Sequence, residues 1–321
     1  MPIRLPAMPR RRFLAGSLAA GAGLLMPRRL LAGESVAPRV VDPNCWALLA
    51  DVHIRADRQT PHRGVLPAEK LAAVVARVVA EDPLPFGAII CGDCAYMQGE
   101  VDDYRVLGEL IAPLADAGMA VYLLLGNHDH REHLHEALPG AAPAGDSAVE
   151  SRHVAVVEST HADLFLLDSL DRTDHTPGLL GDRQRAWLAE QLDARIDRPA
   201  IVLAHHYLNH GEGDTRITTG LQDTGALLEI LLPRRRVKAF FFGHSHRWSV
   251  ARHEDLHLVN VPAVAWLFDA RQPRGWVDLR LSDDGASLRL RTIDRPDDRA
   301  EQPVELAWRA AAAPAELAPT G

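Results

Sequence analysis

Five short apolar runs stand out along the chain, at 45–50, 87–91, 121–125, 200–204 and 239–242. Uninterrupted runs of this length, without polar residues at alternate positions, are typical of strands that are buried on both faces. The pattern therefore predicts five buried strands, distributed over the first three quarters of the sequence.

Helical segments lie between these runs. Their apolar residues recur with the period of a helix face, and they are found at 67–82, 102–118, 181–195 and 223–233. Pro67 fits the first turn of its helix, where no backbone donor is needed. Pro113 lies inside the second segment and is expected to kink or end that helix.

Other segments predict strands in a different order. Residues 153–169 indicate an adjacent pair, and three alternating segments come later at 256–261, 275–281 and 287–293, with 282–286 as a hairpin turn. Strands that alternate with helices, and then a run of strands, indicate an α/β core joined to a mainly antiparallel sheet. No repeat or linker divides the sequence, which favours one domain over residues 40–295.

The two ends of the chain differ from this body. Residues 1–35 have a basic start, an apolar run over 13–26 and a short polar break, the anatomy of an export signal. Arg10 and Arg11 precede Arg12-Phe13-Leu14 and resemble a twin-arginine (Tat) signal. Such a signal implies the Tat export machinery as a partner of the precursor and a periplasmic or secreted protein. The alternative is an uncleaved membrane anchor. Residues 296–321 form an Ala/Pro-rich tail that is expected to add little to the core.

The net charge of the chain argues against some classes of function. The whole chain has a formal charge of −8, and residues 1–33 hold six arginines and no acid, so the remainder carries about −14. Tracking a polyanion requires many basic contacts that release counterions, and a body this acidic is not suited to it. A protein that holds its positive charge as bound metal ions fits the composition better.

The strongest signal lies directly after the five apolar runs. Each run leads into residues of the types that bind metals, and together the five segments supply Asp51, His53, Asp93, Asn127, His205, His244 and His246. Ligands gather beyond the carboxyl ends of strands in open α/β sheets. Oxygen and nitrogen donors in this mixture suit Mn, Fe, Co or Zn and are poor ligands for Ca or Mg. Taken singly, a D-x-H or a Gly-Asp after a strand is most often an ordinary loop; five such motifs in this order are unlike chance.

This series of motifs, D-x-H, G-D, G-N-H-D, a strand-final His and G-H-x-H, resembles the calcineurin-like metallophosphoesterases, nearest to their cyclic-nucleotide-phosphodiesterase-like branch. The resemblance spans roughly residues 45–295 and implies a four-layer α-β-β-α sandwich. It also implies two transition-metal ions, Mn, Fe or Zn. Asp51, His53 and His246 would hold one ion, and Asn127, His205 and His244 the other, with Asp93 between them. His206 could replace His205; the position directly after the strand favours His205.

The same resemblance implies a reaction. A hydroxide bridging the two metal ions would attack a phosphodiester, or a phosphomonoester, in line. His128 would protonate the leaving oxygen as general acid, and Asp129 would orient His128. The alternative from a different class is a non-catalytic metal-binding or scaffold protein on the same fold, although such relatives typically lose residues that are all present here.

Cys91 and Cys94 flank Asp93 as C-x-x-C, which raises the possibility of a redox pair or half a zinc site. Cys91 ends a predicted buried strand, so the interpretation as small apolar residues beside the reactive Asp93 is favoured. Tyr96 creates D-x-x-Y, which is similar to purple acid phosphatases, where that Tyr binds ferric iron. Those enzymes lack the His of D-x-H, so His53 favours a packing role for Tyr96.

The substrate is a small phosphoester whose identity the sequence leaves open. Arg131 comes shortly after the G-N-H-D motif and could clamp a phosphate oxygen; a surface charge at a helix start is the equal alternative. The long polar segment 206–220 has the profile of a specificity loop, in which Asn209 and His210 could face substrate or merely solvent. The oligomeric state is not predicted.

Overall fold

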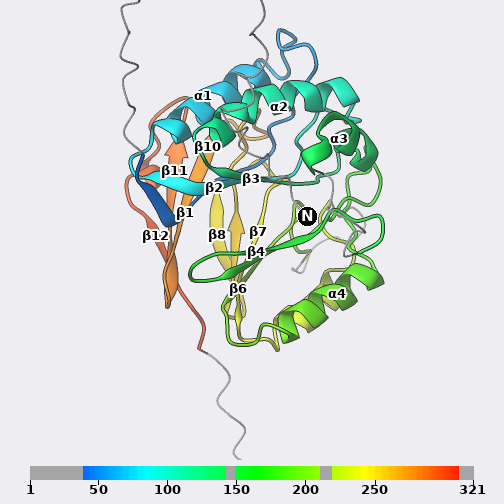
Figure 1. Ribbon diagram of the computed structural model, residues 1–321, viewed down its shortest axis with the longest axis vertical. Coiled ribbons are helices and arrows are strands. Elements are labelled where there is room, and N and C mark those ends of the chain that lie inside the picture. The colour runs from blue at the N-terminus through cyan, green and yellow to red at the C-terminus, as the bar shows by residue number, and fades with distance from the viewer. Residues whose placement is uncertain (1–38, 142–148, 210–218, 311–321) are drawn as a thin grey trace, which may run out of the picture.

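Two six-stranded sheets lie face to face between helices in the computed structural model of the protein (Figure 1). The structure describes residues 39–141, 149–209 and 219–310. The predicted export signal and His210 lie outside the described residues. Within these ranges, no helix is both long enough and apolar enough to span a membrane.

The first sheet has the order β12-β11-β10-β1-β2-β3. Its parallel half consists of β1 (Val41–Leu49), β2 (Leu84–Cys91) and β3 (Ala120–Leu124). Its antiparallel half consists of β10 (Gly275–Leu281), β11 (Gly285–Thr292) and β12 (Val304–Ala307). The predicted antiparallel pair 275–281 and 287–293 is confirmed as β10 and β11, but these strands do not form a sheet of their own, because β10 pairs with the free edge of β1 and extends the first sheet.

The second sheet has the order β4-β5-β6-β7-β9-β8. Its four central strands are parallel: β5 (Asp163–Leu166), β6 (Ala200–Leu203), β7 (Val237–Phe242) and β9 (Leu256–Asn260). Two antiparallel strands close its edges: β4 (Ala155–Glu158) and β8 (Ser249–His253). The predicted strand pair over 153–169 is confirmed as β4 and β5.

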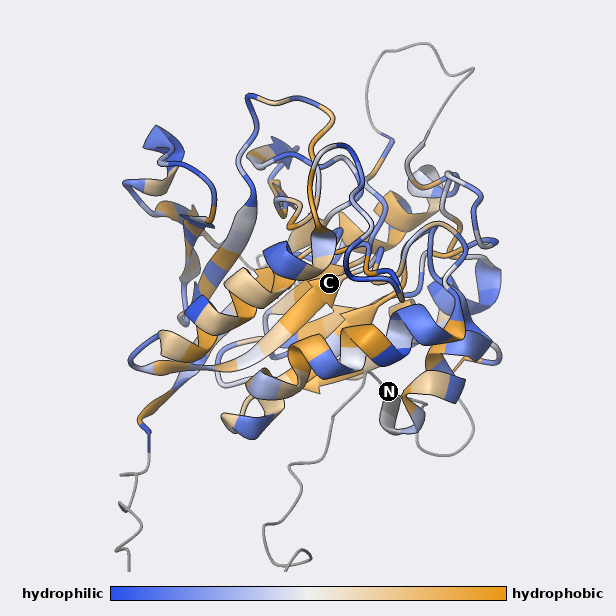
Figure 2. Ribbon diagram, turned by 90° about the horizontal axis from the view of Figure 1, so that it is seen from above, coloured by the Kyte–Doolittle hydropathy of each residue, from blue (hydrophilic) through white to orange (hydrophobic). Residues whose placement is uncertain are grey.

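Four of the five α-helices in the described residues confirm the predicted segments to within a few residues, whereas the short helix over 131–137 was not predicted. They are α1 (Pro67–Ala80), α2 (Val101–Asp116), α3 (Arg131–Ala137), α4 (Asp182–Asp193) and α5 (Thr224–Leu231). Pro113 does not end α2, because it lies in the last turn and its carbonyl still accepts a bond from Ala117 N–H at 3.0 Å. The helices carry one apolar and one polar side, and the strands between them are apolar (Figure 2).

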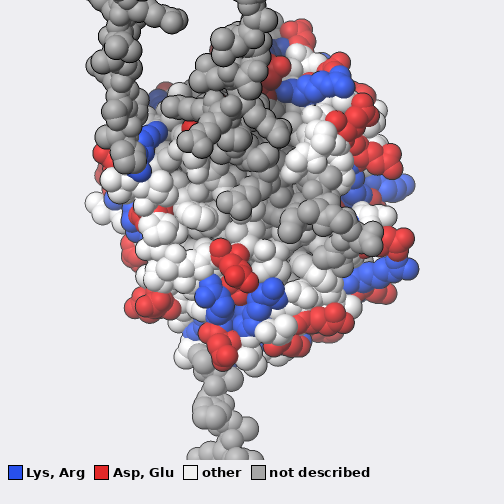
Figure 3. Space-filling model, viewed as in Figure 1, with Lys and Arg blue, Asp and Glu red and all other residues white. Residues whose placement is uncertain are grey.

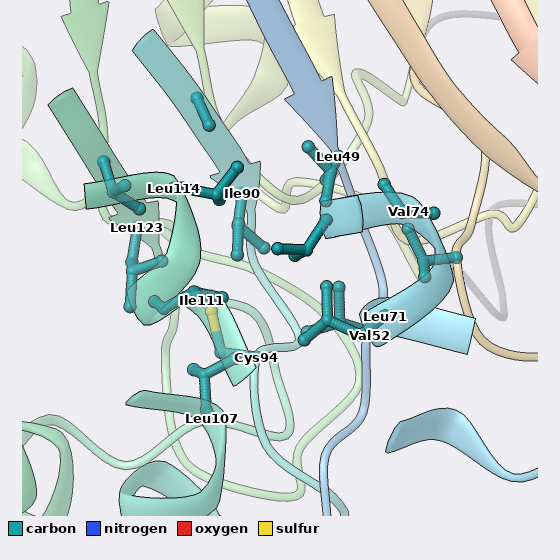
Figure 4. Packing of buried hydrophobic residues seen from close by; sticks show 14 of the residues in the cluster. Leu49, Val52, Leu71, Val74, Ile90, Cys94, Leu107, Ile111, Leu114 and Leu123 are labelled. Carbon is teal, nitrogen blue, oxygen red and sulfur yellow. The ribbon is translucent and has the colours of Figure 1, made fainter. Parts of the chain in front are cut away.

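Three apolar clusters correspond to the three interfaces of four layers. On β1, Ala47 and Leu49 face the cluster beneath α1 and α2, whereas Trp46 and Leu48 face the cluster between the sheets. Figure 4 shows the first of these, where side chains of α1 and α2 meet those of β1 and β2. A third cluster lies between the second sheet and α4 and α5. The α-β-β-α sandwich is confirmed, and burial on both faces explains the uninterrupted apolar runs.

The last described residues belong to the core, which corrects the expectation for the tail. β12 pairs with β11, and Leu306 is buried between the sheets. Arg309 is also buried, and its guanidinium donates to the carbonyls of Val237 (2.7 Å) and Leu231 (2.8 Å). These contacts tie the edge of the first sheet to the second sheet, a pairing that Ala/Pro-rich composition does not reveal.

Charged side chains of both signs are interspersed on the face in Figure 3. Many form ion pairs, as Arg234 does with Asp193 and Arg198 with Asp163.

Candidate metal centre

The predicted ligands lie just beyond the carboxyl ends of five strands and come from both sheets. The first sheet supplies four of them, after β1, β2 and β3: Asp51, His53, Asp93 and Asn127. The second sheet supplies three, after β6 and β7: His205, His244 and His246. The two sets are joined directly, because His244 N–H donates to the Asp51 carboxylate at 3.1 Å. The structure therefore brings all seven predicted positions to the junction of the sheets.

One group of donors consists of Asp51, His53 and His246. The Nε2 atoms of His53 and His246 are 3.2 Å apart, and His246 Nε2 lies 3.3 Å from Asp51 Oδ1. All three side chains are buried. Their ligand atoms converge closely enough for one metal ion to contact all of them.

A second group lies on the other side of Asp93. His205 Nε2 is 3.2 Å from His244 Nδ1. Asp93 Oδ2 lies 3.4 Å from His205 Nε2 and 3.7 Å from His53 Nε2, so this carboxylate stands between the two groups. Asn127 Oδ1 is buried and has no hydrogen-bond partner among the described residues. A buried amide oxygen without a hydrogen-bond partner costs free energy of folding unless an ion or a water molecule contacts it.

Backbone carbonyls fix the tautomers of two of these histidines. His205 Nδ1–H donates to Cys91 O at 2.8 Å, and His246 Nδ1–H donates to Trp266 O at 2.7 Å. Each imidazole is then left with the Nε2 lone pair directed into the cluster. Metal-binding histidines commonly have their other nitrogen engaged in this way.

His206, the alternative to His205, uses both of its ring nitrogens in hydrogen bonds outside the cluster. Its Nε2–H donates to Thr176 O at 2.9 Å, and its Nδ1 accepts from Ser169 Oγ at 2.8 Å. Its ring nitrogens lie near those of His205 and His244, but neither has a free lone pair. These contacts favour His205 as the ligand, as the order along the chain suggests.

The loops that carry the donors have unusual backbone conformations. Five of the seven predicted ligands are non-glycine residues with φ between 45° and 66°: Asp51, His53, Asp93, His244 and His246. This left-handed region costs a residue with a Cβ of order 1 kcal/mol or more, and such residues cluster at functional sites. The backbone is therefore strained at five of the predicted ligand positions, in conformations that direct these side chains into the cluster.

Gly126 shows how closely the loops approach one another. A Cβ at this position would lie 2.2 Å from Asp93 Oδ1 and 2.7 Å from His205 Nε2. Only glycine therefore lets the loop after β3 pass beside the carboxylate that stands between the two groups.

The electrostatics favour cations at this position. Burial, together with the nearby His205, lowers the pKa of His244 to about 4, and burial holds the pKa of His53 well below its usual range. Burial alone would lower the pKa of His205, but the charge and hydrogen bond of Asp93 raise it to about 9. The Asp93 charge that favours a proton on His205 favours a metal cation in the same place, and imidazoles with buried carboxylates form a donor set that fits transition-metal ions.

His128 lies at the open side of the cluster. Its N–H donates to Asp93 Oδ1 at 2.9 Å, and its Nδ1–H donates to Met97 O at 3.0 Å. The ring lies 5.5 Å from that of His53, centroid to centroid. Its Nδ1 is also 3.5 Å from Asp174 Oδ1, which leaves Nε2 as the nitrogen available for chemistry.

Asp129 makes different contacts from those predicted. Its carboxylate is fully buried and accepts from the N–H groups of Gly126 (2.8 Å), Ala95 (3.0 Å) and Cys94 (3.1 Å), and from Tyr104 Oη at 3.0 Å. Burial and the charge of Asp93 raise its pKa to about 6. The expectation that Asp129 contacts and orients the His128 ring is wrong, because these four donors belong to the loops after β2 and β3 and to α2. Asp129 instead joins those loops, and the carboxylate beside the His128 imidazole is that of Asp174.

Arg131 is neither a phosphate clamp nor a free surface charge. Its Nε and Nη2 donate to the two oxygens of Asp168, at 2.6 and 2.9 Å, and it also donates to Leu170 O. Asp168 is completely buried. The bidentate pair fixes α3 to the strand-end segment after β5, so both interpretations of Arg131 are corrected.

Asn209 has a supporting role in the described structure. Its side-chain amide donates to Leu221 O at 2.8 Å, and its N–H donates to Thr224 Oγ1 at 2.9 Å. These bonds connect the end of one described range to the beginning of the next. His210, the other tentative substrate contact, lies outside the described residues.

Tyr96 and the cysteines have contacts of their own. Tyr96 Oη is hydrogen-bonded to His62 Nδ1 at 3.1 Å, consistent with a packing role. Cys91 and Cys94 are buried free thiols in different clusters, Cys91 between the sheets and Cys94 beneath α2 (Figure 4). Burial raises the pKa of both thiols. The interpretation as small apolar residues agrees with this arrangement, and a disulfide between them does not.

Two residues at the site were not identified from the sequence. Trp266 stacks on His53 with ring centroids 3.7 Å apart, and Asp174 faces His128. Both lie in irregular segments far along the chain from their partners. Neither belongs to a periodic pattern or a recognised motif, so no local signal marks them.

Comparison with known proteins agrees with the predicted resemblance. The family model described as "Calcineurin-like phosphoesterase" matches residues 47–248. A 3′,5′-cyclic adenosine monophosphate phosphodiesterase from Pseudomonas aeruginosa is 30% identical over 78% of this chain and 89% of its own length. A probable cyclic nucleotide phosphodiesterase from Rhodopseudomonas palustris is 31% identical over 63% of this chain and 71% of its own.

Solved structures share the fold at low sequence identity. A dimetal phosphatase from Danio rerio superposes with a TM-score of 0.63 at 16% identity, covering 83% of this chain and 100% of that one. A purple acid phosphatase from yellow lupin gives 0.56 at 13% identity, covering 82% and 53%. These similarities establish the four-layer architecture.

Proposed function

The chain belongs to the calcineurin-like phosphoesterase family, and from that membership we propose that it is a dinuclear-metal phosphodiesterase. The observation that carries the proposal is the buried Asp93 carboxylate, which stands between two groups of imidazole and carboxylate donors. The names of the similar bacterial proteins favour diesters over monoesters.

The donors divide into two sets. Asp51, His53 and His246 would hold one transition-metal ion; Asn127, His205 and His244 would hold the other, with Asp93 contributing to both. Two such ions, when bound, polarise phosphoryl oxygens and lower the pKa of water that they bind. Carbonyl bonds to His205 and His246 keep their Nε2 lone pairs available for this purpose.

His128 is proposed as the general acid. Because its Nδ1 already donates to Met97 O, proton donation must come from Nε2 of the cationic imidazolium. The carboxylates of Asp174 and Asp93 lie beside this ring. The proton passes from Nε2 to the leaving oxygen, and the neutral ring remains bound to Met97 O.

Hydrolysis of bis-p-nitrophenyl phosphate and p-nitrophenyl phosphate by the purified protein, with metal content measured on the same sample, tests the proposal. We expect two equivalents of transition metal and faster cleavage of the diester. His128→Ala should lose about 10²- to 10⁴-fold in kcat while it retains the metals. Asp93→Ala should lose both metal and activity.

Two results would reject the proposal. Metal binding without turnover of either ester would favour the non-catalytic alternative. Full activity in His128→Ala would show that His128 is not the general acid. Faster cleavage of the monoester would retain the metal centre and change the substrate class.

The proposed cellular location rests on the sequence alone. The twin-arginine pattern supports export of the folded, metal-loaded protein to the periplasm or beyond. Replacement of Arg10 and Arg11 by Lys should retain the precursor inside the cell, and unchanged export of that variant would contradict the proposal.

A further inference from the structure

A tight turn lies beside the first donor group. His62 and Val65 exchange two backbone hydrogen bonds, at 2.8 and 3.0 Å, and enclose only Arg63 and Gly64. Both enclosed residues have positive φ, 45° and 77°, as a type I′ turn requires. Asparagine, aspartate or glycine normally occupies the first of these positions, and an arginine there is strained. The turn by itself therefore does not account for Arg63.

The side chain of Arg63 is held over an aromatic ring. Its guanidinium carbon lies 5.2 Å from the centroid of the Phe268 ring, a cation–π contact between segments far apart in sequence. The Phe268 ring in turn lies 4.5 Å from that of His246, a candidate metal ligand, although Phe268 is 60% exposed. The guanidinium of Arg63 is therefore separated from the first donor group by a single aromatic ring.

The beginning of the turn contacts the same donor group through a second ring. The His62 ring lies 4.3 Å from that of Trp266, and the Trp266 ring is stacked on His53 at 3.7 Å. His62 Nδ1 is also hydrogen-bonded to Tyr96 Oη at 3.1 Å. These contacts fix the turn relative to the candidate ligands before any substrate arrives.

A second arginine lies next to this turn. The guanidinium carbon of Arg55 lies 4.1 Å from the centroid of the Tyr96 ring, and Tyr96 is the hydrogen-bond partner of His62. Burial, together with the charges of Arg63 and Arg55, lowers the pKa of His62. Both guanidinium charges therefore act on the same side of the metal centre.

Neither of these arginines forms an ion pair with a described residue, in contrast to Arg131. Asp57 and Asp103 feel the charge of Arg55, but other groups occupy their carboxylates. Asp57 accepts from the Thr60 hydroxyl, and Asp103 accepts from Ala56 N–H at 2.7 Å. Unpaired arginines beside a candidate catalytic centre are suited to bind an anion that arrives from solution.

We propose that Arg63 and Arg55 bind a second phosphate group of the substrate, in a phosphodiester that carries this group elsewhere in the molecule. The inference rests on the proposed function, because it narrows the substrate class of the same centre. Guanidinium groups pair with phosphate oxygens through several N–H donors in a fixed arrangement. A phosphodiester with a single charge, bound at the metal centre, would leave both arginines without an anion.

Two esters with the same leaving group test this inference. Thymidine 5′-(p-nitrophenyl phosphate) and its 3′-phosphorylated form both release p-nitrophenolate, and they differ only in the added phosphate. The nucleoside is common to both, so its own contacts cancel in the comparison. The wild type should have a kcat/KM about 3- to 30-fold higher for the 3′-phosphorylated ester, the range expected from one or two partly exposed ion pairs. Added salt should reduce this preference.

Three variants identify the residues responsible. Arg63→Gln and Arg55→Gln should each lower the ratio of the two kcat/KM values about 2- to 5-fold, because each removes one ion pair. Arg289→Gln is the matched control, since Arg289 is exposed and forms no ion pair with a described residue, but lies on β11. This control should keep the wild-type ratio.

Isothermal titration calorimetry measures the same preference without turnover. Metal-loaded wild type should bind thymidine 3′,5′-bisphosphate about 3- to 30-fold more tightly than thymidine 5′-phosphate. Arg63→Gln should reduce that difference in affinity, and Arg289→Gln should retain it.

The outcomes separate the two proposals. Equal kcat/KM for both esters in the wild type, or a ratio that Arg63→Gln leaves unchanged, would overturn the second phosphate site and leave the phosphodiesterase intact. An equal fall of the ratio in Arg63→Gln and Arg289→Gln would also overturn it, because the preference would then come from the general charge of the surface. No turnover of either ester by metal-loaded wild type would overturn both proposals.

Discussion

Individual side chains divide sharply between those that serve the metal centre and those that only support it. Asp93 and His128 belong to the first kind by their positions. Arg131 and Asp129 belong to the second, although they stand in or beside the same short motif. Proximity in sequence to a reactive residue is therefore a poor guide to contact with substrate.

Arg131→Ala should destabilise the protein by about 3–5 kcal/mol, because the buried Asp168 carboxylate loses its bidentate guanidinium partner, although it keeps the N–H donors of His153 (2.9 Å) and Leu170 (3.1 Å). Urea denaturation measures this change. Arg183→Ala is the control, since Arg183 and Glu150 are both more than three quarters exposed, and it should change stability by less than about 0.5 kcal/mol. Unchanged stability of Arg131→Ala with a raised KM would instead revive the phosphate clamp.

His153 should make stability depend on pH in the acid range. Burial, opposed by Asp168, lowers the pKa of His153 from 6.5 to about 4 in the folded protein. Below pH 6.5 the unfolded chain takes up the proton first, so the free energy of unfolding falls as pH falls towards 4. His153→Gln should lose about 1–2 kcal/mol less than wild type between pH 7 and 5. Equal losses in urea titrations of both proteins would contradict this.

At the scale of elements, the strands and helices that could be predicted are those specified by local patterns. The apolar runs ending in Asp51, Asp93 and His205 identified both the strand and the residue at its end. The strand or side chain with which each segment pairs was not predictable in the same way. Nothing local to 275–281 indicates that β10 pairs with β1, and nothing near Arg131 indicates Asp168, because both contacts join segments far apart in sequence.

The candidate metal ligands could be brought together from the sequence because strand ends are local features that share one edge of the fold. Trp266 and Asp174 were not, since they lie in loops whose paths are set by the packed layers. The sequence therefore reveals the chemistry of the centre better than the means by which it selects a substrate.

Leu306→Ala tests the importance of β12. Leu306 is 2% exposed between the sheets, and removal of a buried leucine side chain typically costs about 2–5 kcal/mol. Thermal unfolding should show a melting temperature lower by several degrees. Glu305→Ala, on the exposed side of the same strand, should have little effect. A melting temperature equal to wild type would mean that the last strand contributes as little as its composition suggests.

For the whole molecule, the arrangement of two sheets around one centre couples ligand binding to stability. Each proposed ion takes donors from both sheets: Asp51 and His53 with His246, and Asn127 with His205 and His244. Ions bound to the folded state alone stabilise it by about 2.7 kcal/mol at a hundred times their Kd.

Chelation should therefore lower the melting temperature by several degrees, and added Mn²⁺ or Zn²⁺ should restore it. Differential scanning calorimetry with and without chelator measures the shift. Asp93→Ala, which lacks the donor between the two groups, should show a much smaller shift. The same shift in Asp93→Ala and wild type would place the stabilising ions elsewhere.

The strand order of the first sheet has a consequence for the protein during its synthesis. β1 is paired on one side with β2 and on the other with β10, whose residues are made more than two hundred positions later. A nascent chain that has reached residue 260 carries every candidate ligand and all strands of the second sheet, yet one edge of β1 is still open. An open, apolar strand edge is a template for pairing between chains. Translation that stops before β10 therefore leaves a product prone to aggregation, although it contains the whole metal-binding sequence.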